Sequence, residues 1–297
     1  MNALLSSIEV GSIRLWNRYW PFDRGKELPN RLFSRATNWG LLAPVWHEFQ
    51  PGLWMRLDIR EIGQETILME SIWEPKTTRY LCETLGPGQV FLDIGANAGY
   101  FSLVASRCVG DSGKVLAVEP NPPMAGQVRQ NVRRSGLRNI AVAETACTDS
   151  VEERELFIGN AYNTGNSSLS RENLAWTKSV KVACTTVDRL VEEYQLHRVD
   201  LVKIDVEGAE LQVLRGMRDT LARFRPKVVT ELSPRLLEGF SITLDTVQEH
   251  LTRQGYTVMP LEEDCMGRTT NYRCVSVEYA ESAPSGSTRS RHATGSH

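Results

Sequence analysis

A strand, a glycine turn and the start of a helix follow one another in Val90-Phe91-Leu92-Asp93-Ile94-Gly95-Ala96-Asn97-Ala98-Gly99-Tyr100. Gly95 and Gly99 allow the backbone to turn tightly and to approach a ligand without interference from a Cβ atom. The helix that follows offers unpaired N–H groups in its first turn. A dinucleotide fold would require G-x-G-x-x-G, but Asn97 stands at the second glycine and the third is missing. The loop therefore predicts a ligand that has no pyrophosphate.

Two carboxylates accompany this loop. Asp93 lies at the carboxyl end of the strand, where it suits an ammonium group better than a pyrophosphate. Glu119 follows the next predicted strand, 24 residues after Gly95, where nucleotide folds place the acid that binds ribose hydroxyls. S-adenosylmethionine fits this pair, because it joins an amino acid and a sulfonium to an adenosine. The alternatives are a glycine turn with an incidental acid, a Rossmann-type nucleotide-binding oxidoreductase, and a non-catalytic module that binds S-adenosylmethionine.

Short apolar runs alternate with helical periodicity from Val90 onward, which is typical of repeated βα units around a largely parallel sheet. Apolar residues recur at helical spacing in Phe101 to Cys108, in Met124 to Val132 and again in Val213 to Leu221. The sequence predicts an α/β, Rossmann-like fold with a seven-stranded sheet and helices on both faces. The predicted strands are Val90 to Ile94, Val115 to Val118, Ile140 to Ala146, Val199 to Ile204, Val228 to Glu231, Tyr256 to Pro260 and Arg273 to Glu278.

Composition excludes several classes of protein. The 297 residues are 41% hydrophobic and 24% charged, which argues against a disordered chain, a collagen-like fibre and a disulfide-dense miniprotein. A net charge of −2 gives no electrostatic reason to expect a nucleic-acid partner. The six cysteines lack C-x-x-C pairs and indicate reduced thiols rather than a zinc site. With no signal peptide pattern and no run of 18 apolar residues, we expect a cytoplasmic protein without a transmembrane segment.

The chain is expected to have three parts. Residues 1–72 hold five of the seven tryptophans and predict a helical appendage, which caps the site or forms a homo-oligomer interface. Residues 73–280 predict the S-adenosylmethionine-binding domain, and residues 281–297 a disordered tail. Within the domain, the sequence predicts that Ser150 to Val187 form an insertion made of a loop and a hairpin rather than a buried element. This insertion is a candidate lid over an acceptor.

Several motifs resemble the FkbM family of methyltransferases. They run from Phe91 to Leu103, from Val118 to Pro122 and from Leu201 to Glu210, with a looser match at Ile72 to Pro75. The Lys-Ile-Asp-Val-Glu-Gly-Ala-Glu run in the third motif is specific to the family. Together the motifs span roughly Ile72 to Ser233, which is more than half of the chain.

The resemblance implies a class I methyltransferase fold with a reversed last strand and S-adenosylmethionine at the carboxyl ends of the strands. It also implies methyl transfer to a hydroxyl of a natural-product, small-molecule or glycan-type acceptor. By position, the residues implied to bind the cofactor are Asp93, Gly95, Asn97 and Gly99 at the methionine half, Glu119 with Pro120 and Asn121 at the ribose, Cys147, Thr148 and Asp149 at the adenine edge, and Tyr100, Glu74 and Asp205 around the pocket.

The catalytic residues are expected on the fourth core strand. Lys203, Asp205 and Glu207 alternate there and can share a direction. Methyl transfer to a hydroxyl requires removal of its proton, so one of the two carboxylates is a candidate general base, with Lys203 orienting it or lowering its pKa. Alternatively, Glu207 and Glu210 complement the positive end of the helix that follows.

Dependence on Mg²⁺ is left open at this point. Asp205, Glu207 and Glu231 are the oxygen ligands that such an ion would find at this edge. Many relatives are expected to carry Glu-x-His around the fifth core strand, whereas Ser233 stands in the third position here. We therefore expect no imidazole base from this strand.

Overall fold

The computed structural model describes residues 44–58, 61–159, 167–173, 175–263 and 269–276. The predictions for the first 43 residues, with their three tryptophans, and for the tail at 281–297 lie outside these residues. Among the described residues, no helix is both long and apolar enough to cross a bilayer.

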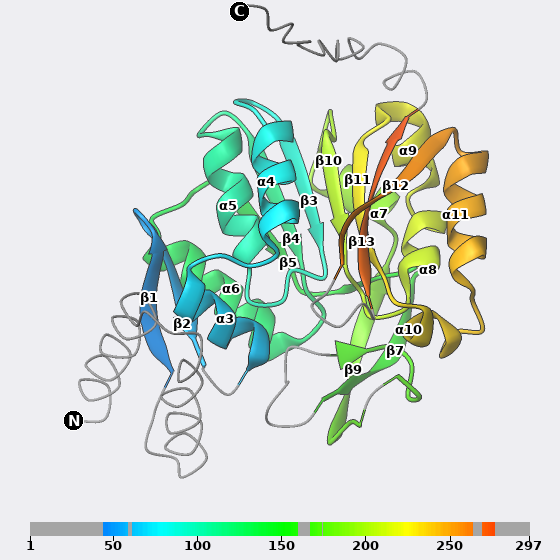
Figure 1. Ribbon diagram of the computed structural model, residues 1–297, viewed down its shortest axis with the longest axis horizontal. Helices are drawn as coiled ribbons and strands as arrows, with labels where there is room; N and C mark the ends of the chain where they lie inside the picture. The colour runs from blue at the N-terminus through cyan, green and yellow to red at the C-terminus, as the bar shows by residue number, and fades with distance from the viewer. Residues whose placement is uncertain (1–43, 59–60, 160–166, 174, 264–268, 277–297) are drawn as a thin grey trace, which may run out of the picture.

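The main sheet has seven strands in the order β12-β13-β11-β10-β3-β4-β5. β13 is antiparallel to both of its neighbours and the remaining strands run parallel, so the predicted sheet with a reversed last strand is confirmed (Figure 1). The strands are β3 (Val90–Ile94), β4 (Lys114–Val118), β5 (Ile140–Ala143), β10 (Leu201–Ile204), β11 (Lys227–Leu232), β12 (Tyr256–Glu263) and β13 (Thr270–Ser276).

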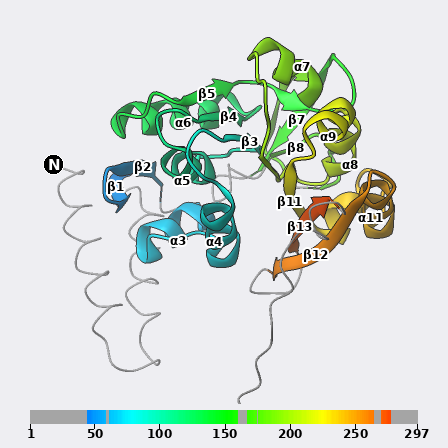
Figure 2. The ribbon, with the colours of Figure 1, turned by 90° about the horizontal axis from the view of Figure 1, so that it is seen from above.

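Helices cover both faces of this sheet, as predicted (Figure 2). On one face, Leu81, Leu103 and Val128 pack into a single apolar core, and on the other Leu190, Val213 and Leu251 form a second. The first layer contains α4 (Pro75–Thr84), α5 (Tyr100–Val109) and α6 (Pro122–Arg134); the second contains α7 (Val187–Glu193), α8 (Glu210–Arg215), α9 (Arg218–Phe224), α10 (Pro234–Glu238) and α11 (Leu244–Arg253).

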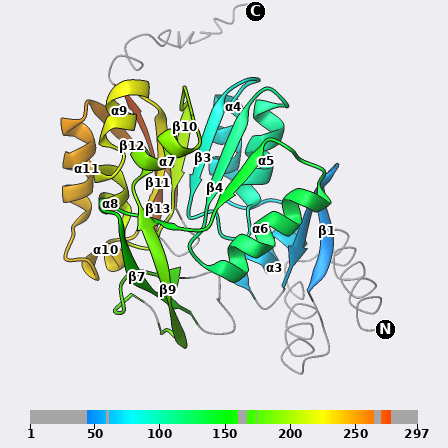
Figure 3. The ribbon, with the colours of Figure 1, turned by 180° about the vertical axis from the view of Figure 1, so that it is seen from behind.

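The segment before the domain is not an all-helical appendage. Residues 45–57 form the antiparallel hairpin of β1 (Val45–Gln50) and β2 (Leu53–Leu57), and α3 (Ile62–Glu70) follows. The hairpin lies against α6 (Figure 3), where Asn131 and Ser135 accept hydrogen bonds from backbone N–H groups of β2. Buried side chains of the hairpin join the first core. The helical prediction is therefore wrong for 45–57, whereas the domain boundary at residue 72 remains a prediction.

The insertion and β6, which precedes it, form a second, four-stranded sheet, β6-β9-β7-β8, beyond the carboxyl ends of the main strands (Figure 1). Its strands are β6 (Ala146–Cys147), β7 (Glu152–Ile158), β8 (Ser167–Ser168) and β9 (Lys178–Thr185). The predicted hairpin is present as β7 and β9, but Leu156, Ile158 and Val182 form a small core of their own. The expectation of an unburied loop is thus wrong. The predicted strand Ile140 to Ala146 is also divided, because β5 ends at Ala143 and β6 joins the other sheet.

Gly95 explains how the glycine loop meets the neighbouring strand. Its φ is +86°, and a Cβ atom built on it would lie 1.8 Å from the backbone carbonyl oxygen of Asp205. The backbone of the glycine loop therefore packs directly against the backbone of the segment that follows β10. The sequence interpretation, in which this glycine frees space for a ligand, is incomplete, because the space is already filled by backbone.

Replacing Gly95 with alanine should destabilise the protein by more than about 3 kcal/mol, because both the backbone conformation and the packing forbid a Cβ atom. Gly126→Ala is a matched control. Gly126 lies in α6 with no atom within 4 Å of the added methyl group, so this variant should be up to about 1 kcal/mol more stable than the wild type. Urea unfolding measures both. Equal stability of the two variants would contradict the close contact between the loop and Asp205.

Candidate active site

A cavity opens to solvent at the carboxyl ends of β3, β4 and β10. This position is where open α/β sheets bind their ligands. The lining residues are Ile94, Gly95, Asn97, Val118, Glu119, Pro120, Thr145, Ala146, Cys147, Asp205, Val206, Glu207 and Ala209 from the main fold, and Leu156, Ser167 and Leu169 from the insertion.

Glu119 fixes the cavity wall next to the glycine loop. One of its carboxylate oxygens accepts the backbone N–H of Asn97 at 2.8 Å, and the other accepts that of Asn121 at 2.9 Å. Burial raises the pKa of Glu119 to about 7, although these two N–H groups oppose the shift. Each carboxylate oxygen has a second lone pair. The residue can therefore accept further hydrogen bonds from a ligand in the cavity.

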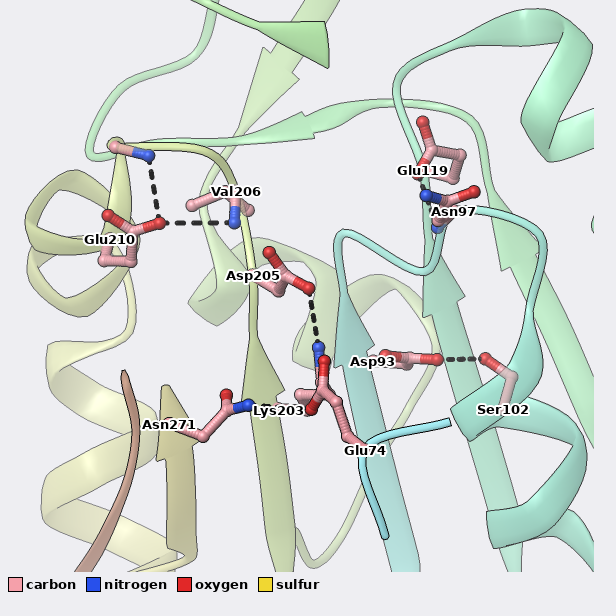
Figure 4. Close-up of polar contacts among 11 residues, drawn as sticks. Glu74, Asp93, Asn97, Ser102, Glu119, Lys203, Asp205, Val206, Glu210 and Asn271 are labelled. Atoms are coloured by element: carbon pink, nitrogen blue, oxygen red, sulfur yellow. Dashed lines mark hydrogen bonds and ion pairs between the residues drawn. The ribbon is translucent and has the colours of Figure 1, made fainter. Parts of the chain in front are cut away.

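Lys203 is the centre of a buried polar cluster behind the cavity (Figure 4). It is 2% exposed, it faces Asp93 across the register of β10 and β3, and its Nζ lies 2.8 Å from Oδ2 of Asp205. The ammonium also lies 4.6 Å from the centre of the Phe101 ring. On the other side, Asp93 accepts the hydroxyl of Ser102 at 2.5 Å. Neighbouring strands thus place one cation among several carboxyl groups.

Lys203 and the carboxyl groups around it shift one another's pKa values. Burial opposes the charge on Lys203, but Asp205, Glu74, Asp93 and Glu231 raise its pKa above the usual range. Burial likewise opposes ionisation of Asp205, yet Lys203 and a hydrogen bond with Glu231 hold its pKa below the usual range. The charge of Asp205, with burial, raises the pKa of Glu231 well above its usual value. Lys203 therefore favours the charged form of Asp205, and Asp205 favours the protonated form of Glu231.

The group of acids that converges at this edge differs from the set predicted for Mg²⁺. Carboxylate oxygens of Glu74, Asp205 and Glu231 lie within 4.8 Å of one another, whereas Glu207 is outside this group. Glu74 precedes α4 with a φ of +41°, and it accepts the side-chain amide of Asn271 at 2.7 Å. Any divalent ion at this edge would thus meet Glu74 in place of Glu207.

Glu207 stands in a tight turn that the insertion holds in place. Its φ is +55°, and its carbonyl accepts hydrogen bonds from Ser168 Oγ and Asn173 Nδ2, each at 2.9 Å. Glu210 secures the same turn by accepting the N–H of Gly208 at 3.0 Å. Burial, followed by the charges of Asp205 and Glu210, raises the pKa of Glu207 to about 8. A carboxyl group with a near-neutral pKa therefore faces the cavity.

The remaining predicted residues fall into two groups. Five of them do not line the cavity: Asp93, Gly99, Tyr100, Asn121 and Glu74. Tyr100 packs between Phe49 and Phe101, and its hydroxyl lies 3.5 Å from that of Thr78. At the expected adenine edge, Cys147 lines the cavity. Thr148 is buried with its carbonyl against Gly216, and Asp149 is exposed away from the lining.

Sequence reasoning missed several residues of the site. Asn271 reaches Glu74 from 197 positions away, and Asn173 joins the Glu207 turn to the carbonyl of Leu236. Neither stands in a recognisable motif. Leu156 and Leu169 line the cavity from the insertion. In the sequence, the apolar character of these two leucines was the one indication that the insertion has buried side chains.

Comparison with known proteins defines the family. The model named "Methyltransferase FkbM domain" matches residues 93–258, more than half of the chain. The chain belongs to the FkbM methyltransferase family. The predicted family and the class I fold are thereby confirmed, since the strand order and the reversed strand agree with them.

Individual relatives are distant. The chain is 28% identical over 235 residues to the AMB antimetabolite synthetase AmbE of Pseudomonas aeruginosa, covering 67% of this chain and 11% of that protein. It is 28% identical over 163 residues to the hexuronic acid methyltransferase AglP of Haloferax volcanii, covering 52% and 63%. The chain thus spans about a tenth of the first relative and less than two thirds of the second. A solved FkbM methyltransferase from Methylobacillus flagellatus KT aligns with a TM-score of 0.44 and 13% identity, covering 85% and 71%.

The distribution of charge around Lys203 predicts the stability of two variants. Lys203→Met leaves the Asp205 carboxylate without its cation and should cost about 3–5 kcal/mol. Glu231→Gln keeps a neutral hydrogen-bond donor beside Asp205 and should cost less than about 1 kcal/mol. Urea unfolding at pH 7 compares the two. Similar losses for both variants would show that Glu231 is charged in the folded protein.

Proposed function

We propose that this protein is an S-adenosylmethionine-dependent O-methyltransferase acting on a hydroxyl of a sugar, glycan or other natural-product acceptor. The observation that carries the proposal is one cavity lined by Glu119, which follows β4, and by Asp205 and Glu207, which follow β10. Glu119 suits a ribose, and the other two carboxyl groups suit a hydroxyl that must lose a proton. Membership of a methyltransferase family supports this assignment.

The residues of the cavity fit the cofactor. Glu119 has free lone pairs for ribose hydroxyls, and Leu156, Leu169 and Cys147 offer an apolar surface for an adenine ring. The glycine loop and Asp93 lie at the side where the methionine half would extend. The insertion therefore contributes to cofactor binding in this proposal, in addition to the role as acceptor lid that its sequence suggests.

When bound, S-adenosylmethionine supplies a methyl group activated by the adjacent positive sulfur. The protein must then hold the acceptor oxygen in line and remove its proton. Glu207 is the better base, because its pKa of about 8 exceeds that of Asp205, which is ionised and paired with Lys203. Asp205 in this scheme orients the acceptor hydroxyl and keeps a fixed negative charge beside the reacting atoms.

The oxidoreductase alternative has less support. Asn97 occupies the position of the second glycine in the dinucleotide pattern, at a φ of +50°, and its N–H is already donated to Glu119.

The proposal of a sugar-type acceptor rests on the similarity to AglP, which is named a hexuronic acid methyltransferase. A cytoplasmic location is part of the proposal, in keeping with five free cysteines among the described residues. Self-association through the tryptophan-rich segment remains a prediction.

The pH dependence of turnover tests Glu207 as the base. A base must be deprotonated to accept a proton, so activity should rise with pH and level off above about pH 8. Glu207→Gln should lower kcat by roughly 10²- to 10⁴-fold, should remove this inflection and should leave the Kd for S-adenosylhomocysteine little changed. Glu172→Gln, which alters an exposed carboxylate in the insertion, is the control and should behave like the wild type. An unchanged profile in Glu207→Gln would refute this role.

The acceptor class can be tested with methyl-labelled S-adenosylmethionine and a panel of uronic acid glycosides, neutral sugars and phenolic natural products. We expect label in a product that survives mild alkali, because a methyl ether is stable and a methyl ester is hydrolysed. Label lost in alkali would contradict the hydroxyl acceptor, since a carboxylate needs no base. Binding of the cofactor without transfer to any member of the panel would favour the non-catalytic module.

A further inference from the structure

Two cysteines meet at the surface, away from the candidate active site. Cys82 near the end of α4 and Cys108 near the end of α5 have their sulfur atoms 3.4 Å apart. Cys82 is exposed and Cys108 is partly buried. Neither residue lines the cavity or belongs to the Lys203 cluster. The pair is therefore free for chemistry that methyl transfer does not use.

The contact makes the two thiols unequal. The thiol of Cys108 donates a hydrogen bond to the sulfur of Cys82. This bond lowers the pKa of Cys82 to about 7, against burial and the nearby charge of Glu83. The pKa of Cys108 is raised, first by the same contact and then by burial. A thiolate is the reactive form of cysteine, so Cys82 is the nucleophile of the pair.

We propose that Cys82 and Cys108 form a reversible dithiol–disulfide site that ties α4 to α5. Both helices begin beside the candidate active site. Glu74 immediately precedes α4, and the glycine loop leads into α5. Near those beginnings, the side chains of Thr78 and Tyr100 already touch. A covalent bond near the other ends would fasten the same two helices a second time.

The reaction balances with a small disulfide, such as oxidised glutathione, as the oxidant. The Cys82 thiolate attacks one sulfur of that molecule and expels the other as a thiolate. Cys108 then loses its proton, and its sulfur attacks Sγ of Cys82 and expels the second small thiolate. Two protein thiols lose two electrons, and one small disulfide becomes two thiols. Reduction by a dithiol reverses the process.

Other described cysteines provide an internal comparison. Cys147, Cys184 and Cys274 are buried, and their pKa values are raised chiefly by burial. They should resist the same oxidant. Cys265 lies outside the described residues, so the bond must be assigned from peptides rather than from the intact mass alone.

The test treats the folded full-length protein with oxidised glutathione and then maps its peptides by mass spectrometry. The wild type should form a peptide pair joined through Cys82 and Cys108, with loss of two hydrogen atoms and no retained glutathione. Formation of the bond should raise Tm by roughly 5 °C or more, because it closes a loop in the unfolded chain. A dithiol reductant should return both measurements to their starting values.

Two variants separate the steps. Cys108→Ala should stop at a glutathione adduct on Cys82, and its alkylation by iodoacetamide at pH 7 should be several-fold slower than in the wild type, since the donated hydrogen bond is lost. Cys82→Ser should leave Cys108 largely unmodified. The proposal is overturned if the joined peptides appear only after denaturation, or if wild-type Cys82 retains glutathione. Neither result depends on cofactor binding or methyl transfer.

Discussion

A single buried ammonium organises the edge of the sheet at which the cavity opens. Lys203 is almost inaccessible to solvent, and a charge in that position is stable only when carboxylates surround it. Those carboxylates come from elements far apart in the chain: Asp93 on β3, Asp205 after β10, Glu231 on β11 and Glu74 before α4. The need to neutralise Lys203 therefore couples the strands to the first helix layer.

This coupling extends to the cavity through the chain after β10. Asp205 belongs both to the Lys203 cluster and to the cavity lining. Its carbonyl contacts Gly95, so the glycine loop has its position fixed by the same segment. Two residues later, Glu207 enters a turn that Ser168 and Asn173 of the insertion hold. The insertion, the loop and the cluster are thus parts of one arrangement, in which Glu207 keeps a near-neutral pKa and Asp205 a low one.

The sequence alone predicted the features that depend on local pattern. Strand and helix periodicity located the seven strands. The predicted alternation of Lys203, Asp205 and Glu207 holds only in part, because β10 ends at Ile204, Asp205 follows it and Glu207 lies in a turn with a φ of +55°. The hydrogen bond from Asn271 to Glu74 could not be predicted, because the two residues are 197 positions apart and no local sequence pattern indicates that they are in contact. The β1–β2 hairpin was readable in principle, since Val45, Phe49, Leu53, Met55 and Leu57 fall at alternating positions of two short strands. Abundant tryptophan and arginine obscured that alternation.

The central claim is that the cavity beside Glu119 binds the adenosyl part of S-adenosylmethionine. Calorimetric titration of the purified protein with S-adenosylhomocysteine tests it most directly, with NADH as the comparison ligand. The account predicts saturable one-to-one binding of S-adenosylhomocysteine and no measurable binding of NADH. Absence of S-adenosylhomocysteine binding in a folded sample, or binding of NADH in its place, would contradict it.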